Sequence, residues 1–254
     1  MPPTGSVNVS RQGVVARVEW ERPPVNVLDS ATLEQLARAL RSREVTSAHV
    51  VVLRGRGKAW SAGLSVEEHL KQSVGPMLKQ FRGVLEALWD VPVPTLAQVH
   101  GACLGGGLEM LAMCDVAVAS ATATLGQPEV RLGVFAPLGA AFFPRVLGDK
   151  RAAELLYLGE SMTAEAARSV GLVNRVVPDA ELEKTVEAMA ASLAGTRRAS
   201  LVCMKQAIRA SAASPWAALD VAERIYLDTL MAGPGAEEGL RAFLEKRKPE
   251  WKEE

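Results

Sequence analysis

The 254-residue sequence has few cysteines and no net charge, and each of these shortages excludes a class of protein. Its three cysteines, Cys103, Cys114 and Cys203, are scattered along the chain. They provide neither a disulfide framework nor the paired spacing of a zinc site, and they suit a reducing, cytoplasmic environment. Lys and Arg number 29, as do Asp and Glu, so no general electrostatic attraction to nucleic acid or to a membrane is expected.

Features of export, membrane insertion and repetition are also missing. The first residues contain no basic region followed by an apolar core, so no signal peptide is predicted. The most apolar region, residues 96–119, is interrupted by His100, Glu109 and Asp115, which predicts a core element and not a transmembrane span. No repeat of 20–50 residues and no low-complexity segment is found. The length allows one large domain, or one domain with a smaller appendage.

Short apolar segments alternate with helical patterns along most of the chain. Residues 7–9 and 14–19 alternate apolar and polar side chains around Gln12-Gly13, which predicts a β-hairpin. Asp29 or Ser30 is expected to cap the next helix, and Ser65-Val66-Glu67-Glu68 predicts a capping box that starts another. These repeated strand, loop and helix units predict an α/β fold with mainly parallel strands, followed from residue 179 by helix after helix.

Three consecutive glycines, Gly105, Gly106 and Gly107, separate an expected strand from an expected helix that contains Glu109. They lack the third glycine of a dinucleotide fingerprint, and no phosphate-binding lysine follows them. The unpaired amides at such a helix start favour an anion, or an oxygen that becomes one during a reaction. Tight packing of strand against helix, with Glu109 as a partner of the helix dipole, explains the same residues without any function.

A second glutamate, Glu129, lies in a turn-rich stretch 20 residues after Glu109 (129 − 109). Paired carboxylates can divide acid and base chemistry, but the spacing does not show that these two meet, and Glu129 alone reads equally well as a solvated loop charge. His100 is interpreted as a hydrogen-bonded histidine without metal-ligand neighbours, Cys103 as a core residue and Asp115 as an anchor of loop geometry.

Taken together, four motifs resemble the crotonase, or enoyl-CoA hydratase, superfamily in their order and spacing, over nearly the whole chain. They are Ser61-Ala62-Gly63-Leu64, Gly105-Gly106-Gly107-Leu108-Glu109, Gly126-Gln127-Pro128-Glu129 and Ala167-Arg168-Ser169-Val170-Gly171-Leu172-Val173. The resemblance implies a spiral of ββα units over residues 1–195 that binds acyl-CoA. It also implies a C-terminal helical region, residues 196–254, that builds a homotrimer or a dimer of trimers.

The resemblance also implies roles for individual residues. The amides of Leu64 and Gly106, both expected at helix starts, match the oxyanion hole. Glu109 matches the base that activates water and Glu129 the acid that protonates the substrate, although two close carboxylates share such roles. For CoA, the Ala62 carbonyl and the loop of Pro24, Val25 and Val27 match the adenine contacts, and Phe243 and Lys246 match contacts from a neighbouring subunit. No metal or redox cofactor is implied, since acyl-CoA is the substrate.

Within the superfamily, residues 22–29, 61–69 and 133–137 look most like the branch of cyclohexa-1,5-diene-1-carbonyl-CoA hydratases. This likeness implies hydration of a cyclic dienoyl-CoA, with Phe135 in the acyl pocket, where a plain core position is the other interpretation. Two further hypotheses stay open: an enoyl-CoA isomerase or another acyl-CoA enzyme that needs one glutamate, and a non-catalytic acyl-CoA-binding protein.

Overall fold

The computed structural model describes residues 5–70, 72–210 and 215–250, which fold around two sheets. In the larger sheet the strands lie in the order β1-β2-β3-β4-β6-β9, and only β1 is antiparallel to its neighbour. The smaller sheet has the order β5-β7-β8. The strands are β1 (Ser6–Gln12), β2 (Val15–Glu21), β3 (Val50–Gly55), β4 (Thr95–Val99), β5 (Ala102–Leu104), β6 (Val116–Ser120), β7 (Thr124–Gly126), β8 (Ser161–Thr163) and β9 (Arg175–Val177).

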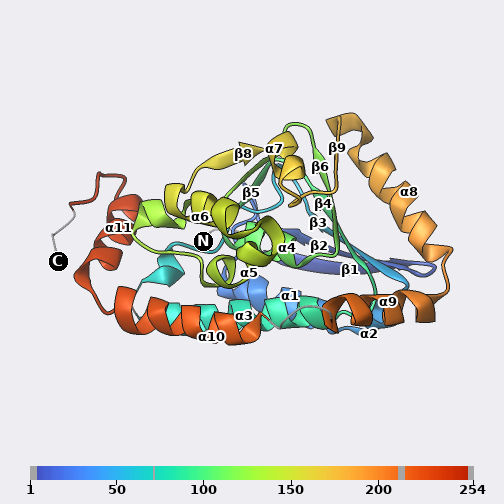
Figure 1. Ribbon diagram of the computed structural model, residues 1–254, viewed down its shortest axis with the longest axis horizontal. Coiled ribbons are helices and arrows are strands. Elements are labelled where there is room, and N and C mark those ends of the chain that lie inside the picture. Colours follow the sequence, from blue (N-terminus) through green and yellow to red (C-terminus); the bar gives the residue numbers. More distant parts are fainter. Residues whose placement is uncertain (1–4, 71, 211–214, 251–254) are drawn as a thin grey trace.

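Helices surround the sheets and occupy most of the C-terminal part (Figure 1). The α-helices are α1 (Ser30–Leu40), α2 (Arg43–Thr46), α3 (Val74–Asp90), α4 (Gly106–Met113), α5 (Pro137–Leu147), α6 (Asp149–Leu158), α7 (Ala164–Ser169), α8 (Leu182–Ala194), α9 (Arg198–Ala210), α10 (Trp216–Arg224) and α11 (Pro234–Leu244). Three short 3₁₀ segments, η1 (Glu67–His69), η2 (Pro128–Leu132) and η3 (Asp179–Glu181), and one π-helical segment, η4 (Ile225–Leu230), complete the elements. No helix within the described ranges is long and apolar enough to cross a membrane.

The chain winds as a spiral in which each turn adds a strand to the large sheet, then a short extended piece, then a helix. Strand β4 leads through β5 to α4, and β6 leads through β7 and η2 to α5. The same order appears earlier, where β3 leads to Ser61, which forms a parallel bridge with Cys103 of β5, and then to α3. The predicted spiral of ββα units is therefore confirmed.

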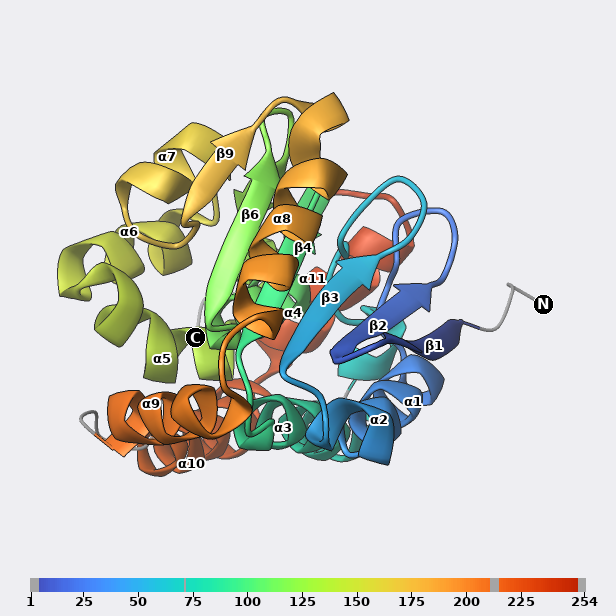
Figure 2. The same cartoon turned by 90° about the vertical axis from the view of Figure 1, so that its right-hand side faces the viewer.

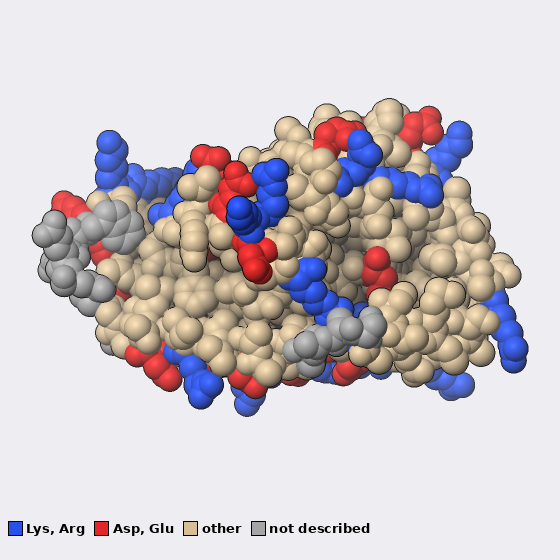
Figure 3. Space-filling model, in the orientation of Figure 1, with Lys and Arg blue, Asp and Glu red and all other residues tan. Residues whose placement is uncertain are grey.

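The large sheet is covered on both faces, which explains its continuous apolar strands. Figure 2 shows α8 across one face, where Leu182, Val186 and Ala190 pack on Val50 and Leu96. The opposite face packs on a larger core that includes residues of α1, α3 and α4. On the face seen in Figure 3 basic and acidic residues are interspersed, in keeping with the balanced composition.

Several local predictions are confirmed, and one is wrong. The β1–β2 hairpin turns at Gly13, which has a φ of +59°, and the Asp29 side chain caps α1 by accepting from the Thr32 N–H at 2.9 Å. The helix expected to start at Ser65 is only the single turn η1, and no side chain caps it. The Glu68 carboxylate instead accepts hydrogen bonds from the Ser30 N–H and hydroxyl, so it stabilises the start of α1 and does not cap its own helical turn.

Candidate active site

The three glycines leave no space for side chains because three other segments fill it. A Cβ on Gly105 would lie 2.6 Å from Oε1 of Glu129, and the φ of Gly105 is +53°. A Cβ on Gly106 would lie 2.7 Å from Cγ of Leu64, and one on Gly107 would meet Ser61 at the same distance. The glycines therefore allow the tight packing of strand against helix that explains them without any function. They also bring Glu129 and Leu64 against the start of α4.

Glu109 projects from α4 into the core and is 2% exposed. Its Oε1 accepts a hydrogen bond from the Gly139 N–H at 2.7 Å, and the Leu138 main chain also binds the carboxylate. These amides belong to the first turn of α5, which favours a negative charge. Burial and the charge of Glu129 nevertheless outweigh this contact and raise the pKa of Glu109 to about 8.

Glu129 reaches the same pocket from η2. Its Oε1 accepts from Nε2 of Gln127 at 3.0 Å, whereas its buried Oε2 has no hydrogen-bond partner within the part of the chain that the structure describes. Burial raises the pKa of Glu129 to about 7. Two interacting carboxyls with raised pKa values share protons near neutral pH, so the pair can supply one acid and one base together.

Two backbone amides beside the glutamates have no acceptor. Gly63 has a φ of +99° and turns the chain toward α4. A Cβ added to Gly63 would lie 3.6 Å from the Gly106 nitrogen. Neither the Leu64 N–H nor the Gly106 N–H donates a hydrogen bond within residues 5–70, 72–210 and 215–250. The Gly106 amide starts α4 as expected. The Leu64 amide is not at the start of a long helix, and its free N–H results from the turn at Gly63.

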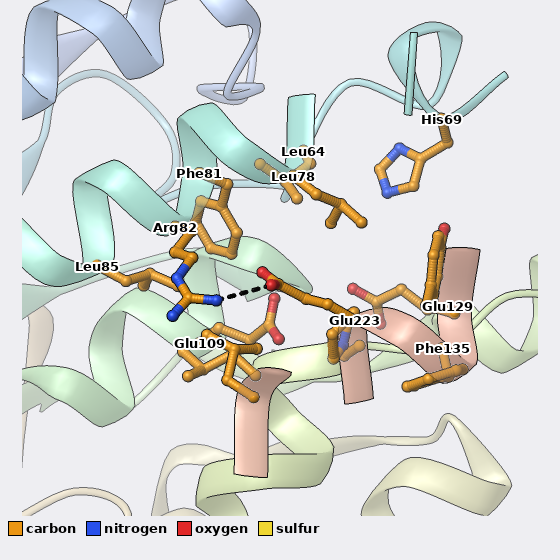
Figure 4. Close-up of a pocket in the computed structure, with 15 residues that line it drawn as sticks. Leu64, His69, Leu78, Phe81, Arg82, Leu85, Glu109, Glu129, Phe135 and Glu223 are labelled. Carbon is orange, nitrogen blue, oxygen red and sulfur yellow. Dashed lines mark hydrogen bonds and ion pairs between the residues drawn. The ribbon is translucent and has the colours of Figure 1, made fainter. Parts of the chain in front are cut away.

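One pocket joins the two glutamates to a largely apolar wall (Figure 4). Phe135 lines it and packs edge-on against Tyr226, with ring centroids 5.2 Å apart. The pocket also contains an ion pair, in which Arg82 of α3 contacts Glu223 of α10 at 2.9 Å. The remaining lining residues are Leu64, His69, Leu78, Phe81, Leu85, Ala136, Pro137, Leu138 and Leu219.

Four polar pocket residues were missed by the sequence reasoning: His69, Arg82, Glu223 and Tyr226. Burial lowers the pKa of His69, and its Nδ1 bonds the Ser65 carbonyl at 2.8 Å, which places the ring proton on Nδ1 and leaves Nε2 as an acceptor. Arg82 shares one helix face with Leu78 and Leu85, a spacing that could have indicated a pocket-facing cation. The sequence contains no comparable indication for Tyr226.

The residues expected near CoA fall into two groups. Ala62 donates its N–H to the Val25 carbonyl at 2.9 Å, so the loop containing Pro24, Val25 and Val27 lies against Ala62. Buried Asn26 shapes this loop, since it has a φ of +56° and bonds three main-chain groups through its side chain. Phe243, which is 54% exposed, lies in the last turn of α11, and Lys246 lies two residues beyond that helix. Neither lines the glutamate pocket.

The remaining polar residues have structural contacts. His100 bonds the Gly57 carbonyl through Nε2 at 3.0 Å. Cys103 is fully buried, and burial raises its thiol pKa. Asp115 pairs with Lys205 at 2.6 Å and also accepts from Thr95, so it joins α9 to the start of β4. None of these three lines the glutamate pocket.

Comparison with known protein families identifies the class to which this spiral fold belongs. The sequence model of the enoyl-CoA hydratase/isomerase family matches residues 10–254, and the chain belongs to this family. The resemblance to the crotonase superfamily is thereby confirmed.

Relatives of known name agree with this assignment. A cyclohexa-1,5-dienecarbonyl-CoA hydratase of Thauera aromatica is 35% identical over 251 residues, which cover 96% of this chain and 95% of the relative. A 2,3-dehydroadipyl-CoA hydratase of Escherichia coli is 34% identical over 96% of this chain and 97% of its own length. The crystal structure of an enoyl-CoA hydratase from Mycobacterium avium subsp. paratuberculosis superimposes with a TM-score of 0.84 at 26% identity, covering 99% of this chain and all of that one.

Proposed function

We propose that this chain hydrates a carbon–carbon double bond conjugated to a CoA thioester. The observation that carries the proposal is the pair of buried glutamates, Glu109 and Glu129, in one pocket beside the unpaired amides of Leu64 and Gly106. Hydration needs a base for water, an acid for carbon and a site for negative charge on the thioester oxygen, and these four groups supply all three.

In this mechanism the thioester oxygen lies between the Leu64 and Gly106 N–H groups. One O–H bond of water breaks as a glutamate takes the proton, and the oxygen forms a bond to the β carbon. The resulting enolate is stabilised by the two amides, and removal of one such donor costs about 3 kcal/mol of barrier. The other glutamate then gives a proton to the α carbon. The resemblance assigns the base to Glu109 and the acid to Glu129. Because the two close carboxyls titrate as a pair that shares a proton, whichever of them is ionised takes the proton from water and the other delivers one to carbon.

The proposed reaction takes its electrophile from the thioester and its acid and base from the glutamates, so it requires no metal or redox cofactor. The Ala62 carbonyl and the loop of Pro24, Val25 and Val27 are proposed to hold the adenine of CoA, because the two segments lie together. Phe243 and Lys246 are proposed to contact the CoA of a neighbouring subunit, since they lie outside the glutamate pocket of their own chain.

We further propose a homotrimer or a dimer of trimers that works in the cytoplasm. The C-terminal helices support such an assembly, because α9 exposes Met204 and α10 exposes Val221, which is followed by exposed Ile225. Light scattering after size exclusion tests this: a monomer at micromolar concentration would contradict the assembly.

A cyclic dienoyl-CoA is the finer proposal for the substrate. The likeness to the Thauera aromatica hydratase supports it, as does the pair of aromatic residues, Phe135 and Tyr226, that lines the pocket. A spectrophotometric assay with crotonyl-CoA and cyclohexa-1,5-diene-1-carbonyl-CoA in parallel tests the choice. Turnover of the diene alone is expected, whereas turnover of crotonyl-CoA alone would indicate a straight-chain hydratase.

The same assay distinguishes the other reactions. Glu109→Gln and Glu129→Gln should each remove most of the hydration rate, because each carboxylate handles a different proton. An isomerase would lose its rate through one of the two changes only. Binding of CoA esters without turnover of either substrate would contradict the hydratase and indicate another acyl-CoA reaction or a non-catalytic protein.

A further inference from the structure

The hydroxyl group of Tyr226 is buried in the glutamate pocket without a partner. The residue is 1% exposed, and its Oη makes no hydrogen bond within the described ranges. Tyr226 lines the pocket together with Glu109 and Glu129. A hydroxyl that leaves water without gaining a hydrogen bond destabilises the fold, so its presence here calls for a partner that binds later.

The position of this hydroxyl is fixed by an unusual segment of helix. Tyr226 belongs to η4, the π-helical stretch that continues α10, and such stretches are rare and frequently occur at functional sites. The ring is held by its edge-on contact with Phe135. A rigid ring presents its hydroxyl in one place and loses little entropy when a ligand binds.

The chemistry of the hydroxyl complements that of its neighbours. Burial, together with the charges of Glu129 and Glu109, raises the pKa of Tyr226, so the group stays protonated and donates a hydrogen bond. The carboxylates accept, and Oε2 of Glu129 is also without a partner among the described residues. An oxygen held among these groups has a use for each of them: it donates hydrogens to the glutamate oxygens, forms its bond to carbon with one lone pair and accepts from Tyr226 with the other.

We propose that Tyr226 is a substrate-binding residue whose hydroxyl donates a hydrogen bond to the oxygen that the reaction adds to, or removes from, the acyl group. The inference rests on the proposed hydratase function and extends it. After hydration this oxygen belongs to the product hydroxyl, which still has a lone pair for Tyr226. The saturated acyl-CoA of the same skeleton has no such oxygen.

The test compares the wild type with Tyr226→Phe, which removes only the hydroxyl. For dehydration of the hydration product of cyclohexa-1,5-diene-1-carbonyl-CoA, kcat/KM is expected to fall about 5- to 10-fold, as for a lost neutral hydrogen bond. If crotonyl-CoA is turned over instead, 3-hydroxybutyryl-CoA takes the place of that product. The inhibition constant of the saturated ester, butyryl-CoA or its cyclic counterpart, should stay within about 2-fold, because that ligand never contacts the hydroxyl.

A measurement of folding stability and a matched control variant distinguish substrate binding by the Tyr226 hydroxyl from a purely structural role. The urea-unfolding free energy of Tyr226→Phe should equal or exceed that of the wild type, because the hydroxyl has no partner in the free chain. Tyr157→Phe, at a site 78% exposed on α6, is the control and should match the wild type throughout.

Three results would overturn the inference: an unchanged kcat/KM, an equal loss for the hydroxylated and saturated ligands, or a destabilised Tyr226→Phe chain. Failure of the proposed function itself looks different. In that case the wild type would turn over neither substrate, and the inference would fall with it.

Discussion

Replacing Glu109 by Gln should stabilise the folded chain, and by more at alkaline pH than at acid pH. The Glu109 carboxyl has a pKa of about 8 in the folded chain against an ordinary value of 4.5. Between pH 4.5 and about pH 8 the Glu109 carboxyl of the folded chain keeps a proton that the unfolded chain has released. The wild type therefore loses stability as the pH rises through this window. A glutamine carries no charge there, and its amide oxygen can still accept from the Gly139 N–H.

The size of the effect follows from the same two pKa values. Linkage gives a loss of about 3 kcal/mol for the wild type between pH 5 and pH 8 that the Glu109→Gln variant avoids. Urea unfolding of both proteins at pH 5 and pH 8, at one protein concentration, measures this difference. Glu165→Gln is the control, because Glu165 is exposed on α7 and pairs with Arg168, and this variant should lose the same stability as the wild type between pH 5 and pH 8. A gap between wild type and Glu109→Gln that stays constant or narrows toward pH 8 would refute the reasoning.

Three other substitutions test the surroundings of the site. Gly105→Ala places a Cβ 2.6 Å from Oε1 of Glu129 at a φ of +53°, so hydration should slow by about 100-fold, and a wild-type rate would contradict the close approach. Arg82→Gln leaves the acids of α10 unpaired and should cost about 2 kcal/mol in urea unfolding at pH 7, and an unchanged unfolding free energy would contradict this. Lys205→Met removes the nearer of the two cations that pair with Asp115, the other being Arg209, and should lower the unfolding free energy by about 2 kcal/mol, which thermal unfolding checks; unchanged stability would show that the Lys205–Asp115 pair contributes nothing.

The fold was largely predictable because its strands and turns depend on local chemistry. Residues 50–53 form a continuous apolar run, as strands buried on both faces do, and Gly13 supplies the positive φ of the hairpin. The missing helix at Ser65 shows the limit of such reasoning. Glu68 has the right spacing for a capping box, but it binds the start of α1, which is distant in sequence.

The site was predictable only in part. Glu109, Glu129 and the glycines could be named from their motifs. That they meet in one pocket depends on how β4, β5 and η2 are stacked, which their spacing in the sequence does not predict. The raised pKa values come from burial, which only the packed structure shows. Tyr226 lies more than 95 residues beyond both glutamates and enters the pocket from a π-helical turn that its local sequence does not announce.

The first turn of α5 binds the Glu109 carboxylate through its main chain, and this contact limits how the protein can be re-engineered. Residues 135–138 line the glutamate pocket, and Leu138 and Gly139 also bind the Glu109 carboxylate. A library that varies this segment to admit new substrates would also displace the Glu109 carboxylate, so under the proposed mechanism most of its members would be inactive. Positions on α3 and α10, such as Phe81 and Leu219, face the same space and make no contact of this kind with the carboxylate. Directed evolution of substrate range should therefore begin on those two helices.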